Sequence, residues 1–176
     1  MKGKSFLLAL CIILLAGTSV LAIQTEITVH VKTKDAKFLG TLMGGASVSI
    51  KDVQTGAILA TGLTTGGTGD TMLIMKTPVT RGVPISDGSA AKFTATIDID
   101  EPRLIEVSAY GPMANLQAAN RVSATQWVVP GKHITDGDAW MLELPGFAVD
   151  VIAPPAPATL QGVPQDVTIT ANVVMM

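Results

Sequence analysis

Two histidines are the first side chains in this sequence that could carry chemistry. A histidine acts as a general base, or activates a nucleophile, when a serine, aspartate or glutamate lies beside it. No Gly-x-Ser-x-Gly or His-Glu-x-x-His motif accompanies His30 or His133. Strand alternation places His30 on a polar face, and His133 lies in a Pro-Gly turn. We therefore expect both to be surface residues, and we predict that the protein is not an enzyme and needs no cofactor.

Two acidic turns could hold a metal ion through carboxylate oxygens. Asp136 and Asp138 lie in a segment superficially like a calcium loop, but an EF-hand needs further oxygen ligands where this chain has Ala139-Trp140. A second acidic tip contains Asp98, Asp100 and Glu101. Calcium at a loop end is one hypothesis, and an ordinary solvated turn is the alternative.

Methionine thioethers give another metal hypothesis, because exported proteins use thioether and imidazole ligands for copper. Met72 and Met75 have the Met-x-x-Met spacing, and Met141 and His133 could complete such a site. We expect residues 72–75 to form a strand, in which side chains three apart point to opposite faces. That geometry favours the alternative, in which methionines fill irregular spaces in the core.

The first 22 residues have the organisation of a secretory signal peptide. Lys2 and Lys4 precede an apolar run that ends at Ala16, and Val20 and Ala22 are small-type residues at the −3 and −1 positions of a cleavage site. An uncleaved signal anchor is the alternative, since the apolar segment is at the lower length limit of a membrane span. We predict a secreted protein, at the cell surface, extracellular or periplasmic, with no membrane span after cleavage.

The composition excludes several classes of protein. Of the 176 residues, 48% are hydrophobic and 15% are charged, which excludes a disordered chain. Without the signal segment there are 10 basic and 14 acidic residues, and aromatics make up 4%, so we expect no nucleic-acid-binding surface. The single cysteine, Cys11, lies in the signal segment. The mature chain therefore has no disulfide, and its core must hold the fold unaided.

Alternation of apolar and polar residues predicts short strands with turn signals between them. The expected strands cover residues 27–32, 46–52, 57–61, 72–75, 92–98, 104–110, 123–129, 139–144, 147–152 and 167–174. Residues 113–121 are the one expected helical turn. This pattern predicts an all-β fold, an antiparallel Ig-like or transthyretin-like β-sandwich. The large residues expected in its core are Tyr110, Trp127, Trp140 and Phe147.

We predict four parts along the chain. They are a signal peptide (1–22), a β-sandwich domain (23–152), a Pro-rich linker (153–164) and a C-terminal strand (165–176). The prolines stiffen the linker, so the last strand is expected to be only loosely attached. Two placements stay open for it, either paired back onto the sandwich or lying across a neighbouring molecule.

The segment from Ile27 to Gly111 resembles the carboxypeptidase regulatory-like, or transthyretin-like, domains. The matching elements are Gly45-Ala46-Ser47-Val48-Ser49-Ile50, Thr55-Gly56, Ala60-Thr61-Gly62, Gly69-Asp70 and Val107-Ser108-Ala109-Tyr110-Gly111. They are turn and core positions, so the resemblance implies a fold and a non-catalytic folding, adhesion or interaction module. One branch of the superfamily hydrolyses a purine-degradation intermediate and has a C-terminal Tyr-Arg-Gly-Ser tail. This chain ends in Asn-Val-Val-Met-Met, so that activity is not expected here.

These observations together predict an exported, non-catalytic interaction or assembly (filament-like) subunit at the cell surface or outside the cell. Exposed edge strands and a tethered terminal strand favour a protein partner, or self-assembly, through strand pairing. The alternative function is a periplasmic protein that binds a small ligand or a metal, copper or calcium. Its candidate ligands are Met72, Met75, His133, Asp136 and Asp138.

Overall fold

The computed structural model describes residues 22–159 and 161–176. The predicted signal segment, apart from Ala22, lies outside the described residues, so it stays a prediction. None of the helices in the described ranges has the length and apolar character that a membrane crossing requires.

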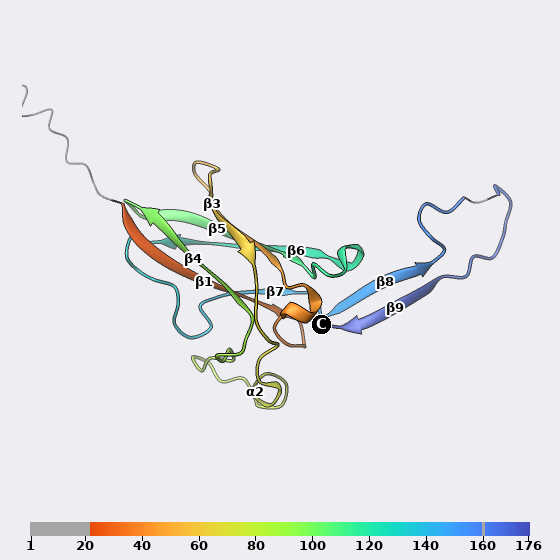
Figure 1. The fold of residues 1–176 in the computed structure, drawn as a ribbon, viewed down its shortest axis with the longest axis horizontal. Coiled ribbons are helices and arrows are strands. Elements are labelled where there is room, and N and C mark those ends of the chain that lie inside the picture. The colour runs from red at the N-terminus through yellow and green to blue at the C-terminus, as the bar shows by residue number, and fades with distance from the viewer. Residues whose placement is uncertain (1–21, 160) are drawn as a thin grey trace, which may run out of the picture.

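Two β-sheets pack face to face and form the body of the molecule (Figure 1). In the four-stranded sheet the order is β3 (Ile58–Leu63), β2 (Ser47–Asp52), β5 (Arg103–Gly111) and β6 (Asn120–Val128). In the three-stranded sheet it is β4 (Lys92–Ile99), β1 (Ile23–Thr33) and β7 (Trp140–Leu144). The predicted all-β sandwich is confirmed. One pairing differs from the antiparallel expectation, because β1 and β7 run parallel.

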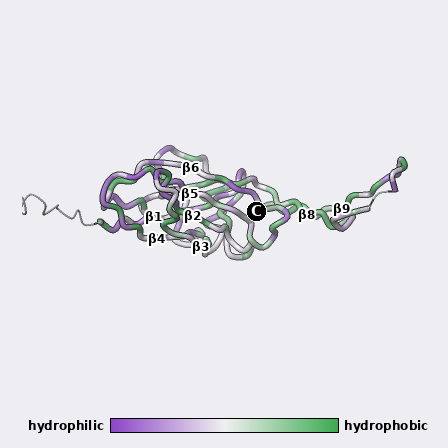
Figure 2. The backbone as a smooth tube through the Cα atoms, turned by 90° about the horizontal axis from the view of Figure 1, so that it is seen from above, coloured by the Kyte–Doolittle hydropathy of each residue, from purple (hydrophilic) through white to green (hydrophobic). Residues whose placement is uncertain are grey.

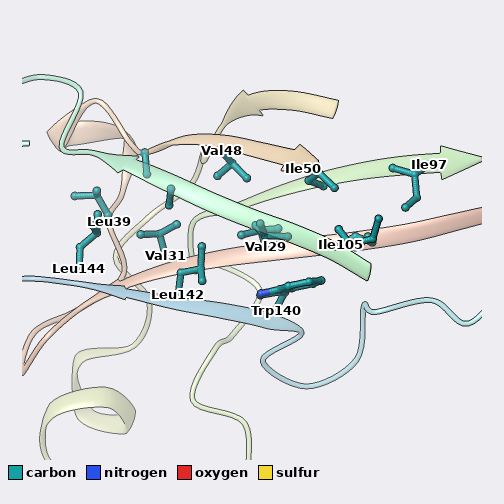
Figure 3. Close-up of a cluster of buried hydrophobic side chains, with 14 of the residues drawn as sticks. Val29, Val31, Leu39, Val48, Ile50, Ile97, Ile105, Trp140, Leu142 and Leu144 are labelled. Carbon is teal, nitrogen blue, oxygen red and sulfur yellow. The ribbon is translucent and has the colours of Figure 1, made fainter. Parts of the chain in front are cut away.

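The core lies between the two sheets and consists of the inward residues of each strand. Val29 and Val31 of β1 face Val48 and Ile50 of β2 across it (Figure 3). All four side chains are fully buried. Burial of a Val or Ile side chain stabilises a fold by about 1.5–3 kcal/mol, so this alternating pattern is sufficient to hold the sheets together without a disulfide.

The outer face of β1 is also covered, which the sequence did not lead us to expect. The chain between β3 and β4 folds over it, and its Ile74 and Ala90 form a second buried cluster with Phe38, which lies in the segment after β1. His30 is therefore only 4% exposed, and its prediction as a surface residue is wrong. A strand with two buried faces is one whose polar residues find hydrogen bonds inside the protein.

Residues 71–75 form a short helix, α2 (Thr71–Met75), and the prediction of a strand there is wrong. Asp70 begins the helix because its carboxylate accepts hydrogen bonds from the backbone N–H groups of Met72 (2.7 Å) and Leu73 (3.0 Å). An aspartate at this position is a strong helix start signal. The Asp70 cap favours a helix, and it outweighs the preference of the apolar Met-Leu-Ile-Met run for a strand.

Two short 3₁₀ helices complete the body. The first, η1 (Thr41–Met43), follows β1, and the second, η2 (Leu116–Ala118), lies within the segment expected to form a helical turn. Of the four aromatic residues expected in the core, Trp140 is buried, whereas Trp127 and Phe147 are mostly exposed and Tyr110 is half-buried. The prediction is thus wrong for Trp127 and Phe147.

The last two strands, β8 (Phe147–Ala153) and β9 (Thr170–Met175), leave the body as an antiparallel hairpin. Figure 1 shows it projecting from one end of the sandwich, and β1 begins at the opposite end. The sequence analysis placed residues 147–152 in the sandwich, but β8 pairs only with β9 among the described strands. We call residues 147–175 the arm.

Candidate functional site

The side chains of the calcium hypothesis serve the fold. Asp138 accepts hydrogen bonds through Oδ1 from the backbone N–H groups of Ile85 (2.9 Å) and Ser86 (2.7 Å), so it holds the long loop between α2 and β4. Asp136 is exposed. At the second acidic tip, Arg103 donates to Asp100 at 3.0 Å and thereby holds the pKa of that carboxyl below its usual value.

The residues of the copper hypothesis are divided between different places. His133 is exposed, and its Nδ1 accepts a hydrogen bond from the backbone N–H of Glu26 (3.0 Å). Met72 and Met75 share one exposed face of α2, because residues three apart in a helix are neighbours. Within the described ranges, no three His, Cys, Asp or Glu side chains gather where they could hold a metal ion.

His30, the other histidine, has a structural environment. Its Nδ1 lies 2.9 Å from the carbonyl oxygen of Ala91, and since a carbonyl only accepts, Nδ1 carries the proton. The ring also packs against Phe38 with a centroid separation of 5.3 Å. Burial lowers the pKa of His30 from its ordinary value of 6.5. The neutral imidazole therefore links β1 to the start of β4.

The arm presents the most unusual surface of the molecule. In an antiparallel pair, directly opposed residues lie on the same face, and successive residues alternate between faces. The register pairs Phe147 with Met175, Val149 with Val173, and Val151 with Ala171. One face of the hairpin is therefore entirely apolar, and we call it the arm face. Its six members are Phe147, Val149, Val151, Ala171, Val173 and Met175.

The arm face is open to solvent. Phe147 is 57% exposed, Val173 59% and Met175 58%, and the other three members are exposed too. The hydropathy colouring of Figure 2 shows green along β8, where the hairpin leaves the body. The opposite face differs, since it carries the polar pair Asp150 and Asn172. Soluble proteins seldom leave an apolar surface of this kind uncovered unless it binds something.

Two depressions lie at the ends of the arm face. At the base, a groove of about 520 Å³ is lined by four methionines and by Leu42; we call it the base groove. The methionines are Met43, Met75, Met175 and Met176. Towards the tip, a hollow of about 410 Å³, the tip hollow, is lined by Val151, Ile169 and the Pro154-Pro155 segment. Met175 and Val151 belong to the arm face, so the groove, face and hollow form one continuous apolar surface.

The body fixes the direction of the arm at two points. Gly146 joins β7 to β8 against the backbone of Lys34, where a Cβ atom would collide with the Lys34 carbonyl oxygen. Met176 follows the arm back into the core, and its carbonyl oxygen accepts a hydrogen bond from Thr33 Oγ1 (2.9 Å). Both strands of the hairpin are thus anchored at their bases.

A side chain of the body also contacts the arm part-way along. Gln117, in η2, accepts a hydrogen bond from the backbone N–H of Val151 through Oε1. Its Nε2 donates to the Val151 carbonyl oxygen at 3.4 Å. The amide thereby occupies the two backbone groups that a neighbouring strand would use at this point of β8. The outer edge of β9 has no such contact with another described strand.

Sequence reasoning found the terminal strand but missed the surface that it helps to form. The alternation of Phe147, Val149 and Val151 was visible, as was that of Val173 and Met175. Their common face depends on the β8–β9 register, which alternation alone does not give. No motif or alternation in the sequence indicated that Leu42 or Gln117 would contact or border the arm.

Comparison with known proteins assigns no family to this arrangement. No family model, curated protein or solved structure matches the chain.

Proposed function

We propose that the protein is an exported, non-catalytic β-sandwich that works as an interaction or assembly subunit at the cell surface, outside the cell or in the periplasm. The observation that carries this proposal is the exposed, wholly apolar arm face. An apolar hairpin anchored at both strands is a costly feature for an isolated soluble protein, and contact with another protein surface removes that cost. The open edge of β9 supports strand pairing as part of the binding mode.

The signal-like first 22 residues support export, and the absence of cysteine from residue 23 onwards suits an oxidising compartment. The transthyretin-like resemblance of residues 27–111 supports an interaction module. Its matched turns include Thr55-Gly56, where Gly56 has a φ of 74° in the tight connection between β2 and β3. Such modules present surfaces for binding and leave catalysis to other domains.

Two matched substitutions test the proposal. Val173→Lys places a charge on the arm face, whereas Asn172→Lys places the same charge on the opposite face, across from Asp150. Burial of an unpaired charge is expensive, so we expect Val173→Lys to lower association at least 100-fold. Asn172→Lys should leave it within a factor of three. Native mass spectrometry and light scattering measure the assemblies, and the native mass also reports whether residues 1–22 have been removed.

Association of any order that is lost in Val173→Lys and kept in Asn172→Lys supports the proposal. A wild-type protein that remains monomeric up to millimolar concentration would contradict the assembly role, and equal effects of the two variants would contradict binding through the arm face. Circular dichroism of both variants checks that the sandwich is intact.

The base groove favours a second candidate function, binding of a soft metal or a small apolar ligand. Four thioethers line this one groove, and Met75 is among them, although the other predicted ligands lie elsewhere. Thioether sulfur is a ligand suited to Cu(I). Metal analysis of protein purified without chelator tests this function. One equivalent of copper that is lost in Met75→Leu would support it, and metal-free protein that also fails to take up added Cu(I) would exclude it.

A further inference from the structure

The apolar arm face is open to solvent, and the arm face of a second copy is a surface that matches it. We propose that the arm face packs against the arm face of a second copy, with the two arms antiparallel about a two-fold axis and Leu42 of each copy seated in the tip hollow of the other. This inference rests on the proposed function. It adds the identity of the partner, the symmetry and a specific contact.

The two ends of the surface are complementary in shape. Leu42 is 95% exposed on η1, at the margin of the base groove, so its whole side chain is available to a partner. The tip hollow is apolar and lies at the other end of the arm face. A leucine side chain is well below the 410 Å³ of this hollow in volume. A protruding residue at one end and a depression at the other are what a self-complementary surface requires.

An antiparallel arrangement brings these ends together without any adjustment. When the two-fold axis is perpendicular to the arms, the base of each arm lies opposite the tip of the partner's arm. The paired part of the arm spans six residues of β9, or roughly 20 Å at the rise of a β-strand. The distance from base to tip is identical in both copies, so when one Leu42 meets the partner's hollow the other does as well.

The charges near the two ends are complementary too. The base groove is lined by Lys37 and Lys76 in addition to its methionines. The tip loop contains an exposed Asp166, which is one of only two charged residues in the arm; the other is Asp150 on the opposite face. Antiparallel packing brings the partner's tip, with Asp166, towards these two lysines. Complementary charge at the margin of an apolar contact fixes its register.

The area also matches that of a stable dimer. The exposed portions of the arm face, Leu42 and Ile169 amount to roughly 700 Å² per copy, and two copies therefore bury about 1,400 Å², within the usual range for a specific interface. The arm carries no basic residue, which disfavours an anionic membrane as the occupant. A second copy supplies an apolar face of the same size and is always present.

Disulfide trapping between two single-cysteine variants tests the contact. The sequence from Ile23 onwards has no cysteine, and Cys11 is replaced by serine if the signal segment is retained. Leu42→Cys is mixed with Ala158→Cys, whose position lines the tip hollow, and the mixture is oxidised mildly. Ile58→Cys, an exposed position on β3, replaces Leu42→Cys in the control. Leu42 and Ala158 are both exposed, so neither change disturbs the core.

We expect a dimer in native mass spectra, and a disulfide-linked heterodimer from Leu42→Cys with Ala158→Cys at least ten times more abundant than from the control pair. A ladder of higher oligomers, or equal trapping with the control, would overturn the two-fold arrangement and leave association through the arm intact. A monomer under all conditions would overturn the second copy as the occupant of the arm face, without contradicting the proposed interaction with a different protein. Binding to neutral lipid vesicles without any dimer would identify a membrane as the occupant, and thus contradict the second copy.

Discussion

Among single residues, His30 shows how a chemically capable side chain can be used for structure. Its Nδ1–H donates to Ala91, and Phe38 covers the ring. Lys92 lowers its pKa further while the hydrogen bond and Asp138 oppose the shift, and the net direction is down. A protonated imidazole is therefore unfavourable in this position, and protonation is coupled to unfolding.

This coupling predicts a pH dependence of stability. Well above pH 6.5 the histidine is neutral in both states and contributes no slope. As the pH falls through 6.5, the unfolded chain binds a proton that the folded protein resists, so stability falls until the pH reaches the lower pKa of the folded state. We expect His30→Gln to flatten this dependence between pH 6.5 and 5. Urea unfolding at several pH values measures it. An unchanged slope in the variant would contradict the assignment to His30.

The same residue shows why part of the site escaped prediction. Strand alternation correctly put Val29 and Val31 in the core, because a period of two follows from strand geometry alone. Alternation predicted a polar face for His30. Whether that face meets water depends on Phe38, in the segment that follows β1, and on Ala91, which is 61 residues further along the chain. Met72 and Met75 were assigned to a strand because the apolar run was weighed more heavily than the Asp70 cap.

At the scale of elements, the arm is a two-stranded sheet, a structure that is marginal by itself in water. Its anchors at Gly146 and Met176 hold the base, and the Gln117 amide binds Val151 near the middle. These contacts reduce the number of orientations that the hairpin can adopt. Binding then loses less conformational entropy than it would with a free segment.

Removal of the Gln117 contact tests this role of the body. Gln117→Ala deletes both hydrogen bonds to Val151 and should weaken local order of the arm by about 0.5–1.5 kcal/mol. Amide hydrogen exchange is expected to accelerate several-fold for residues 149–152 while exchange in β1 and β5 stays unchanged. Leu116→Ala, at the exposed neighbouring position, is the control. Equal acceleration in both variants would show that the Gln117 amide has no special part.

Sequence reasoning placed most strands within a few residues but could not pair them. The Pro145-Gly146 turn and the proline-rich stretch after β8 marked where segments end. These signals did not show that β8 lies outside the sandwich, because an apolar strand such as Phe147–Ala153 can pack in a core or in an interface. The distinction depends on strand pairing: β8 pairs with β9 and not with β7, although β7 is an edge strand of the three-stranded sheet.

For the whole molecule, the consequence of the proposed dimer is a link between concentration and stability. A partner that binds only the folded protein stabilises it by mass action. The Tm of the wild type should therefore rise by a few degrees between micromolar and several hundred micromolar protein. Val173→Lys should have a constant Tm that is equal to the dilute wild-type value. Differential scanning calorimetry provides the measurement, and a concentration-independent wild-type Tm would argue against a folded dimer.

The parallel pairing of β1 with β7 has a kinetic consequence. Lys32 and Glu143, which form an ion pair at 3.4 Å across these strands, are 111 residues apart in the chain. β1 thus lies at the centre of its sheet, and its partner β7 is synthesised only after β2 to β6. Closing such a long loop is entropically expensive, and folds of this topology form slowly. Until β7 is available, β1 lacks one of its two neighbours, and the three-stranded sheet cannot be completed.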